Sequence, residues 1–370
     1  MRRLRFPLAV ALLAAPLLVQ LATPPARGIS ADELRPLAPP PRLARWRTLP
    51  AQTDAWLRDH FGLRRPLIHA QAWLAHGLLR SGNGKVLIGP GGRPFLRENR
   101  MVAQSAGVKF DRAGILAAAD MLAALRDALA LQGATLLVAP PPNASSIDAG
   151  DLPAWARNPG RRTEYDLLLS ELAARGVAAV DLRPVMRALK ATTDPYRRTD
   201  SHWTPRAALA AFNAIVAAAG LPGWRLAADA ALTPKLPVPP GDLDRMLDLT
   251  DAPVERVRMP ALQAGIAQPL DGRQWGAFAR RIPGRDGPTI VVIGDSFTRT
   301  LIPPLALAHA GVVAWLHHDE CGFDFRLVAR LRPAQVWYMP TERLLACVPG
   351  RYPAALPASA ALASSGAKAR

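Results

Sequence analysis

The sequence predicts an α/β fold in which helices cover both faces of a mostly parallel sheet. First, helical patterns alternate with short apolar runs: residues 111–133 precede the run at 134–140, and residues 164–176 precede the run at 177–182. Second, the apolar run "TIVVIG" (289–294) continues directly into a helical pattern. Such alternation is typical of helix-covered parallel sheets, whose ligands bind at the carboxyl ends of the strands.

The other elements follow in chain order. Residues 53–80 have the apolar spacing of a helix, with Leu67 and Leu74 on its apolar face, and residues 85–96 form a hairpin-like unit around a glycine-rich turn. Helices are expected in "RPVMRALKA", "PRAALAAFNAIVAAAG" and "RLVARLRP", and strands in "VVAWL" and "AQVWYMP". Residues 222–288 interrupt this pattern with many prolines. A structureless loop of that length is uncommon in a compact domain, so we interpret them as an insertion that contains some strands.

The N-terminal segment predicts export. Three arginines precede an apolar stretch of 16 residues, Pro7–Ala22, which is shorter than the ~20 residues of a membrane-spanning helix. Residues 1–28 are therefore expected to be a signal peptide or a retained signal anchor, which predicts a periplasmic protein, either free or anchored to the inner membrane. Residues 29–52 form a Pro-rich linker, residues 53–352 the domain, and residues 353–370 a low-complexity, flexible tail.

The chain has two cysteines, Cys321 and Cys347. An exported protein can form a disulfide, but the distance between the two residues cannot be read from the sequence, so pairing stays open. No paired Cys-x-x-Cys motif indicates a zinc or redox site.

The charge balance is strongly basic, with 46 Lys+Arg against 29 Asp+Glu and a formal net charge of +17. Two interpretations stay open. A genome rich in G and C would favour arginine, alanine and proline together, whereas a functional excess would attract an anionic polysaccharide or membrane surface. The cations are scattered and no nucleic-acid motif is present, so no nucleic-acid partner is expected.

The segment "TDSHWT" (199–204) lies at the start of an Ala-rich helix. Thr204 or Ser201 could cap this helix, but capping does not account for Asp200 and His202. On an extended segment, residues two apart point the same way, so the carboxylate could orient the imidazole.

Ser296, in "GDSF", follows a buried strand and begins a helix. Its backbone N–H would lie at a positive helix end and could stabilise an oxyanion. A serine hydroxyl is a poor nucleophile unless a base activates it; His202 can be that base, with Asp200 holding its orientation. Each block alone fits a helix cap, but their joint occurrence predicts a Ser–His–Asp group.

The "GDS" block followed by a helix resembles the SGNH hydrolase superfamily. Usual members have this block near the start of the chain and an Asp-x-x-His block near the end, whereas here an Asp-x-His block comes first. That order resembles the alginate O-acetyltransferase family of the AlgJ/AlgX type, with support from "DHFGLRRPLI", "VAPPPN" and "YMPTERLL" between about Thr53 and Cys347. The resemblance implies an SGNH hydrolase-like α/β/α sandwich and a catalytic triad of Ser296, His202 and Asp200.

Further residues are candidates for supporting roles. Asn143, in "PPPNASS", would lie at the carboxyl end of a strand and is a candidate oxyanion donor. Arg206 and Arg299 are near the catalytic blocks and could contact an anionic sugar.

Two more features concern the surroundings of the site. Asp295 is expected to shape its turn, and Glu342 and Arg343 are expected to form an ion pair. The stretch "HHDEC" has no matching cluster of ligands elsewhere, so no metal is expected.

The sequence and its resemblance together predict a periplasmic O-acetyltransferase that moves acetyl groups onto an exported polysaccharide through an acyl-Ser intermediate. The implied partners are the polysaccharide acceptor, a membrane-bound O-acyltransferase that donates acetyl groups, and other exopolysaccharide secretion proteins; no cofactor is expected. Two alternatives stay open. The same triad with water as acceptor would make a carbohydrate esterase, and an inactive chain would be a polysaccharide-binding scaffold of a secretion complex.

Overall fold

The computed structural model describes most of the chain after the N-terminal segment: residues 36–60, 63–249, 254–270 and 276–348, with residues 10, 14–15 and 18–19. The rest of the expected signal segment (1–28), the first part of the expected linker (29–35) and the expected tail (353–370) lie outside the described residues. Within the described residues, no helix is both long enough and apolar enough to span a bilayer.

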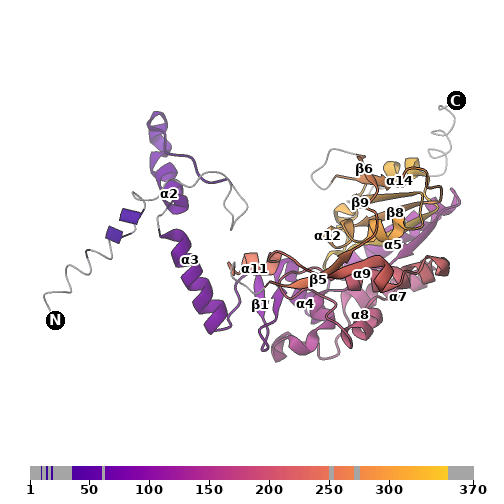
Figure 1. Cartoon of the computed structure of the whole chain (residues 1–370), viewed down its shortest axis with the longest axis horizontal. Helices are drawn as coiled ribbons and strands as arrows, with labels where there is room; N and C mark the ends of the chain where they lie inside the picture. Colours follow the sequence, from indigo (N-terminus) through magenta and orange to yellow (C-terminus); the bar gives the residue numbers. More distant parts are fainter. Residues whose placement is uncertain are drawn as a thin grey trace.

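A six-stranded sheet forms the centre of the domain, with strands in the order β3–β10–β8–β9–β7–β6 (Figure 1). The first four of these are parallel to one another, whereas β7 and β6 continue the sheet in antiparallel fashion. The strand bounds are β3 (Thr135–Val138), β10 (Gln335–Met339), β8 (Thr289–Gly294), β9 (Val312–His317), β7 (Phe278–Arg281) and β6 (Ile266–Pro269).

Alternation along the strands divides the core into two layers. On one face, strand residues such as Val292 and Trp337 pack with Phe212 of α9 (Pro205–Ala218) and with α13 (Ile302–Leu307). On the other face, strand residues such as Val291 pack with α5 (Arg112–Ala130), α7 (Glu164–Ala174) and α14 (Phe325–Leu331). The predicted α/β sandwich with a mostly parallel sheet is therefore confirmed.

Shorter elements connect this framework. The predicted hairpin is present as β1 (Val86–Ile88) and β2 (Pro94–Leu96), and the predicted short helix as α8 (Arg183–Lys190). Other short helices around the sheet are η4 (Glu98–Arg100), α4 (Met101–Ser105), α6 (Ala144–Ile147), η5 (Ala149–Asp151), η6 (Ala154–Ala156), α12 (Ser296–Arg299), η8 (Asp319–Cys321) and η9 (Glu342–Leu344).

The strand expected at 177–182 is not formed. The segment makes one isolated parallel bridge to the edge strand β3, between Ala179 and Val138, and exchanges only two hydrogen bonds with it. The chain then turns into α8 at Arg183, which leaves no room for a longer ladder.

The insertion at 222–288 contains strands, as expected, but it does more than flank the sheet. Its last two strands, β6 and β7, extend the central sheet itself. Its first part forms a separate two-stranded unit of β4 (Leu232–Pro237) and β5 (Arg256–Pro260), together with η7 (Pro222–Trp224), α10 (Ala228–Ala231) and α11 (Asp242–Met246).

The predicted helix at 53–80 is broken into several pieces. After η2 (Leu43–Thr48), the chain forms α2 (Leu49–His60), α3 (Arg64–Ala72) and the π-helical η3 (Trp73–Leu78), and this arm extends away from the sheet (Figure 1). The expectation of a packed apolar face is wrong for Leu67 and Leu74, which stay exposed because the arm leaves the domain.

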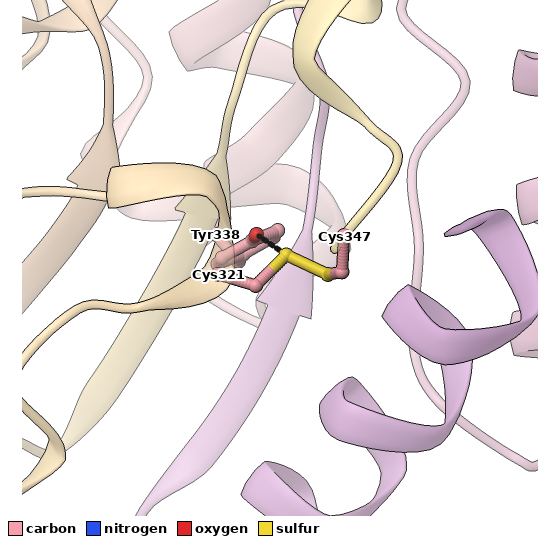
Figure 2. The surroundings of a disulfide bond; sticks show 3 residues. All are labelled: Cys321, Tyr338 and Cys347. Atoms are coloured by element: carbon pink, nitrogen blue, oxygen red, sulfur yellow. Dashed lines mark hydrogen bonds between the residues drawn. A yellow bond between two sulfur atoms is a disulfide. The ribbon is translucent and has the colours of Figure 1, made fainter. Parts of the chain in front are cut away.

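The two cysteines are bonded to each other (Figure 2). Cys321 ends η8, which follows β9, and Cys347 lies after η9, which follows β10; their Cα atoms are 5.5 Å apart. The sulfur of Cys321 also lies 3.6 Å from the Tyr338 hydroxyl. The bridge therefore ties together two loops at the carboxyl edge of the sheet and resolves the alternative that the sequence left open.

We predict that replacing both Cys321 and Cys347 by Ala lowers the free energy of unfolding by about 3 kcal/mol. The sequence separation is 26 residues, and a cross-link of that span restricts the unfolded chain by roughly this amount. Denaturant unfolding of both proteins measures the difference. Adding a reductant should destabilise the native protein but leave the double variant unchanged; equal midpoints without reductant would contradict the prediction.

Candidate active site

The turn after β8 places Ser296 at the carboxyl edge of the sheet, at the first position of α12. The turn is tight, as the space around Gly294 shows: a Cβ on this residue would lie 2.3 Å from Thr298 Oγ1. Only glycine lets α12 approach the end of its strand this closely. As the first residue of the helix, Ser296 has a backbone N–H without an acceptor inside the helix.

The buried carboxylate of Asp295 holds this turn. One oxygen accepts from Phe297 N–H at 2.8 Å, and the other accepts from the N–H and hydroxyl of Thr341 at 2.8 and 2.5 Å. Burial favours the neutral acid, but the charge of Arg343 and the Thr341 hydrogen bonds outweigh it and lower the pKa of Asp295. The expectation that Asp295 shapes the turn is confirmed.

Three predicted site residues meet beside this turn. Ser296 Oγ lies 2.9 Å from His202 Nε2, and His202 Nδ1 lies 2.6 Å from Asp200 Oδ1. Ser296 and His202 are both half-buried. The hydroxyl, imidazole and carboxylate form one continuous chain of hydrogen bonds, in which the carboxylate can hold the imidazole and the imidazole can accept the hydroxyl proton.

Asp200 and His202 come together through a bend, not through an extended strand. Asp200 Oδ1 accepts from both the backbone N–H and the ring Nδ1–H of His202, at 3.0 and 2.6 Å. The two side chains are therefore neighbours, as predicted, but a bend and not the alternation of an extended strand brings them together. Thr204 then caps α9 by accepting from Ala207 N–H, which selects it over Ser201 as the cap.

The other oxygen of Asp200 is held by groups that the sequence did not single out. Asp200 Oδ2 accepts from Arg197 at 3.2 Å and from the backbone N–H of Asp242 at 3.3 Å. Asp242 also binds Ser201 through its carboxylate, at 2.5 and 2.6 Å. A Cβ on Gly241 would lie 2.0 Å from Thr199 O, so glycine is required where α11 meets this bend.

These contacts keep Asp200 ionised. Burial would raise its pKa, but the hydrogen bond and charge of His202, together with the charge of Arg197, outweigh burial and bring the pKa well below its usual range. An ionised carboxylate on Nδ1 fixes the imidazole so that Nε2 faces Ser296 as an acceptor.

Aromatic packing fixes the bend against α12. The indole N–H of Trp203 donates to Phe297 O at 2.9 Å, and the rings of His202 and Phe297 are 4.9 Å apart. Trp203 and Phe297 are both fully buried. His202 and Ser296, 94 residues apart in sequence, are therefore held by the same core contacts.

Comparison with known proteins identifies the domain. A family model described as "SGNH hydrolase-like domain, acetyltransferase AlgX" matches residues 94–308, more than half of the chain. The chain belongs to this family and is an O-acetyltransferase. The resemblance drawn from the "DSHW" and "GDSF" blocks is thereby confirmed.

Three solved structures are similar to this chain to different degrees. PatB1 of Bacillus cereus, in a structure with a sulfonyl adduct, has a TM-score of 0.53 at 14% identity, covering 70% of this chain and 95% of that one. The O-acetyltransferase domain of Pseudomonas putida AlgJ has a TM-score of 0.47 at 20% identity, covering 75% and 97%. Pseudomonas aeruginosa AlgX has a TM-score of 0.43 at 15% identity, covering 69% and 61%. The comparison with curated proteins gives no match.

In the O-acetyltransferase domain, Asn143 is completely buried at the carboxyl end of β3. Its side-chain amide donates to Gln104 Oε1 at 3.2 Å, and its backbone N–H donates to Glu342 Oε2 at 2.7 Å. One amide N–H is therefore used inside the protein. The role of Asn143 as an oxyanion donor stays a prediction.

The two candidate arginines have different surroundings. The guanidinium of Arg299 lies 5.5 Å from the ring centres of both Phe278 and Trp315, and its Nε atom is buried without a partner among the described residues. Arg206 is half-buried in the first turn of α9. Contact of either arginine with a sugar stays a prediction.

The expected ion pair between Glu342 and Arg343 is wrong. Glu342 points into the core, where it accepts from Asn143 N–H at 2.7 Å and from the Ser146 hydroxyl at 2.8 Å. Arg343 turns the other way and lies 4.9 Å from the centre of the Phe297 ring. Consecutive residues of a short helix face different directions, so adjacency in sequence did not make them partners.

Two histidines, His317 and His318, lie at the end of β9 and directly after it. His318 is buried, and burial lowers its pKa to about 4, so it is neutral at physiological pH.

A different set of residues, Asp200, His202 and Asp242, has possible metal-ligand atoms within 4.8 Å of one another. The 2.6 Å contact within it is a hydrogen-bond length, which fits an oriented imidazole. The absence of a metal from the function stays a prediction.

We predict that Glu342→Gln changes how stability depends on pH. Burial raises the pKa of Glu342 to about 7, against hydrogen bonds from Asn143 and Ser146 that lower it. The folded protein binds this proton more tightly than the unfolded chain, whose Glu pKa is about 4.3. The resulting stabilisation is complete below about pH 4.3 and is lost as the pH rises to about 7.

The amide that replaces the carboxyl group can accept from Asn143 and donate to Ser146, so the variant should fold. Its free energy of unfolding, relative to the native protein, should rise by up to about 3 kcal/mol between pH 4 and pH 8. Chemical denaturation across this range measures the difference, in which other titrating groups cancel. A difference independent of pH would show that folding does not raise the pKa of Glu342.

Proposed function

We propose that the chain is a periplasmic O-acetyltransferase that moves acetyl groups onto hydroxyls of an exported polysaccharide through an acetyl-Ser296 intermediate. The observation that supports this most directly is the chain of contacts from Ser296 Oγ to His202 Nε2, at 2.9 Å, and from His202 Nδ1 to Asp200, at 2.6 Å. Both lie within hydrogen-bond reach, as activation of a serine requires.

In the first half-reaction, His202 Nε2 removes the proton from Ser296 Oγ as this oxygen attacks the acetyl carbonyl carbon of the donor. The tetrahedral intermediate collapses, the bond to the leaving group breaks, and His202 gives its proton to the departing oxygen. Asp200 stays ionised and stabilises the imidazolium in between. The product is an acetyl ester on Ser296.

In the second half-reaction, a sugar hydroxyl takes the place of the leaving group. His202 removes its proton, the sugar oxygen attacks the acetyl-serine carbonyl, and Ser296 departs with the proton from His202. Atoms and charge balance without a cofactor. The backbone N–H of Ser296, which has no acceptor within α12, is the donor that we assign to the oxyanion of both tetrahedral intermediates.

The acceptor and partners follow from the family resemblance and the charge of the chain. A net charge of +17 favours approach of an anionic polymer. The resemblance to alginate O-acetyltransferases implies a membrane-bound O-acyltransferase as the source of acetyl groups and other secretion proteins as neighbours. The basic, apolar N-terminal segment supports export to the periplasm, by a cleaved signal or a retained anchor.

We predict that Ser296→Ala abolishes acetyl transfer but leaves the protein folded. The change removes the acyl acceptor, whereas Asp295 still caps α12. His202→Ala should lower transfer nearly as much, and the double variant should be no worse, because the residues act as one unit. Asp200→Ala should retain some activity, since this residue orients the base. The measurement is acetate bound to the cell's exported polysaccharide, with protein levels compared in parallel.

Purified protein with an acetyl ester and candidate glycans tests the acceptor. Ester on the glycan supports transfer, release of free acetate alone indicates an esterase, and no reaction indicates a scaffold. A Ser296→Ala strain that makes normally acetylated polymer would rule out the acyl-serine mechanism.

A further inference from the structure

The N-terminal arm, residues 42–80, exposes large apolar side chains. Trp46 is 71% exposed and Trp73 is 66% exposed. By contrast, Trp203, Trp315 and Trp337 of the sheet domain are fully buried. Tryptophan is a largely buried residue type, so its exposure at two places on one arm indicates a surface that another body covers. Figure 1 shows that this arm lies away from the sheet.

Exposed leucines form a stripe along α3 and η3 of this arm. Leu67, Leu74 and Leu78 are all exposed, and their spacing of seven and four residues places them on one face of a helix. Ala72 and His76 lie on the other side of the same helix and are buried. The stripe is therefore the outward face of an amphipathic helix whose inward face is already packed.

The arm is also strongly basic. Residues 42–80 contain seven arginines and two aspartates, and neither lysine nor glutamate. Both aspartates are engaged within the arm and its flank. Asp54 pairs with Arg58 at 2.5 Å, and the buried Asp59 accepts from Ala38 N–H at 2.8 Å. The charge that the arm offers to a partner is therefore positive, which favours an anionic partner.

Exposed tryptophan, leucine and arginine together fit the interface between a lipid bilayer and water. The guanidinium of Arg47 lies 5.6 Å from the centre of the Trp46 ring, and both residues are exposed. Tryptophan is enriched at the level of lipid headgroups, and basic amphipathic helices bury their apolar face at the boundary of headgroups and acyl chains. A second copy of the arm fits less well, because it would bring like charges together.

We propose that the arm docks on the surface of an anionic phospholipid bilayer. Leu67, Leu74 and Leu78 enter the boundary of headgroups and acyl chains, and the arginines bind lipid phosphates. This contact is separate from the apolar segment Pro7–Ala22 and is the same whether that segment is cleaved or retained. It holds the domain beside a membrane and does not depend on the proposed transfer reaction.

The test places a fluorescent probe on the full chain through Leu74→Cys. Cys321 and Cys347 are buried and bonded to each other, so the added thiol is the one that reacts. The labelled protein is mixed with vesicles of phosphatidylglycerol and phosphatidylethanolamine. We expect the probe to lose its quenching by iodide in water and to become quenched by brominated acyl chains, because the stripe enters the bilayer.

The matched control is Leu131→Cys, which carries the same probe at a residue that is 66% exposed directly after α5. Anchoring through the segment Pro7–Ala22 alone would leave both probes in water, so only docking of the arm separates them.

The role of charge is tested on the Leu74→Cys protein. Phosphatidylcholine vesicles should leave its probe quenched by iodide, and Arg45→Gln combined with Arg47→Gln should abolish the protection on anionic vesicles. Persistent iodide quenching at position 74, equal protection at position 131, or equal protection on phosphatidylcholine would each overturn the proposal. Protection without vesicles would also overturn it and would indicate a second copy of the chain as the partner.

Discussion

The geometry of the site depends on one buried carboxylate. Asp295 joins the end of β8 to the chain after β10, because its two oxygens accept from Phe297 on one side and from Thr341 on the other. The two strands are paired in parallel up to Gly294 and Met339, so the sheet sets the position of both partners. The sheet therefore fixes the position of Ser296, which follows Asp295. The helix α12 has only four residues and would not fix this position by itself.

The imidazole of His202 reaches the same edge by a different route. His202 lies on a bend that is held by Asp200, by α11 and by the indole of Trp203. In sequence, this bend directly precedes α9 and is not in the last part of the chain. A proton relay needs only the right distances at one edge of the sheet, so the order of the blocks along the chain is free. This explains how an Asp-x-His block that precedes the serine can build the same hydrogen-bonded group.

The sequence was most informative where local patterns determine structure. Apolar runs gave the four parallel strands, and the junctions at Thr204 and Ser296 marked the places where helices begin. The sequence did not predict contacts between residues that are far apart in the chain, such as the support of Asp200 by Asp242, 42 residues away. Nor did it predict that β6 and β7 join the central sheet, because the Pro-rich insertion that contains them has no clear hydrophobic periodicity. The Glu342–Arg343 pair failed for a related reason, because the buried donors Asn143 and Ser146 lie almost 200 residues earlier and compete for the carboxylate.

The position of Glu342 also affects the charges around Asp295, at the carboxyl edge of the sheet. Glu342 points into the core and does not neutralise the charge of Arg343. The Arg343 guanidinium lies over the Phe297 ring instead, and this cation–π contact holds it without cancelling its charge. Its field acts on Asp295 and is the largest influence that opposes the cost of burying this carboxylate. An ionised Asp295 accepts three hydrogen bonds, which a neutral acid would do less well. Because Glu342 does not pair with Arg343, the charge of Arg343 can stabilise the Asp295 carboxylate. The group that positions Ser296 therefore stays charged although it is buried.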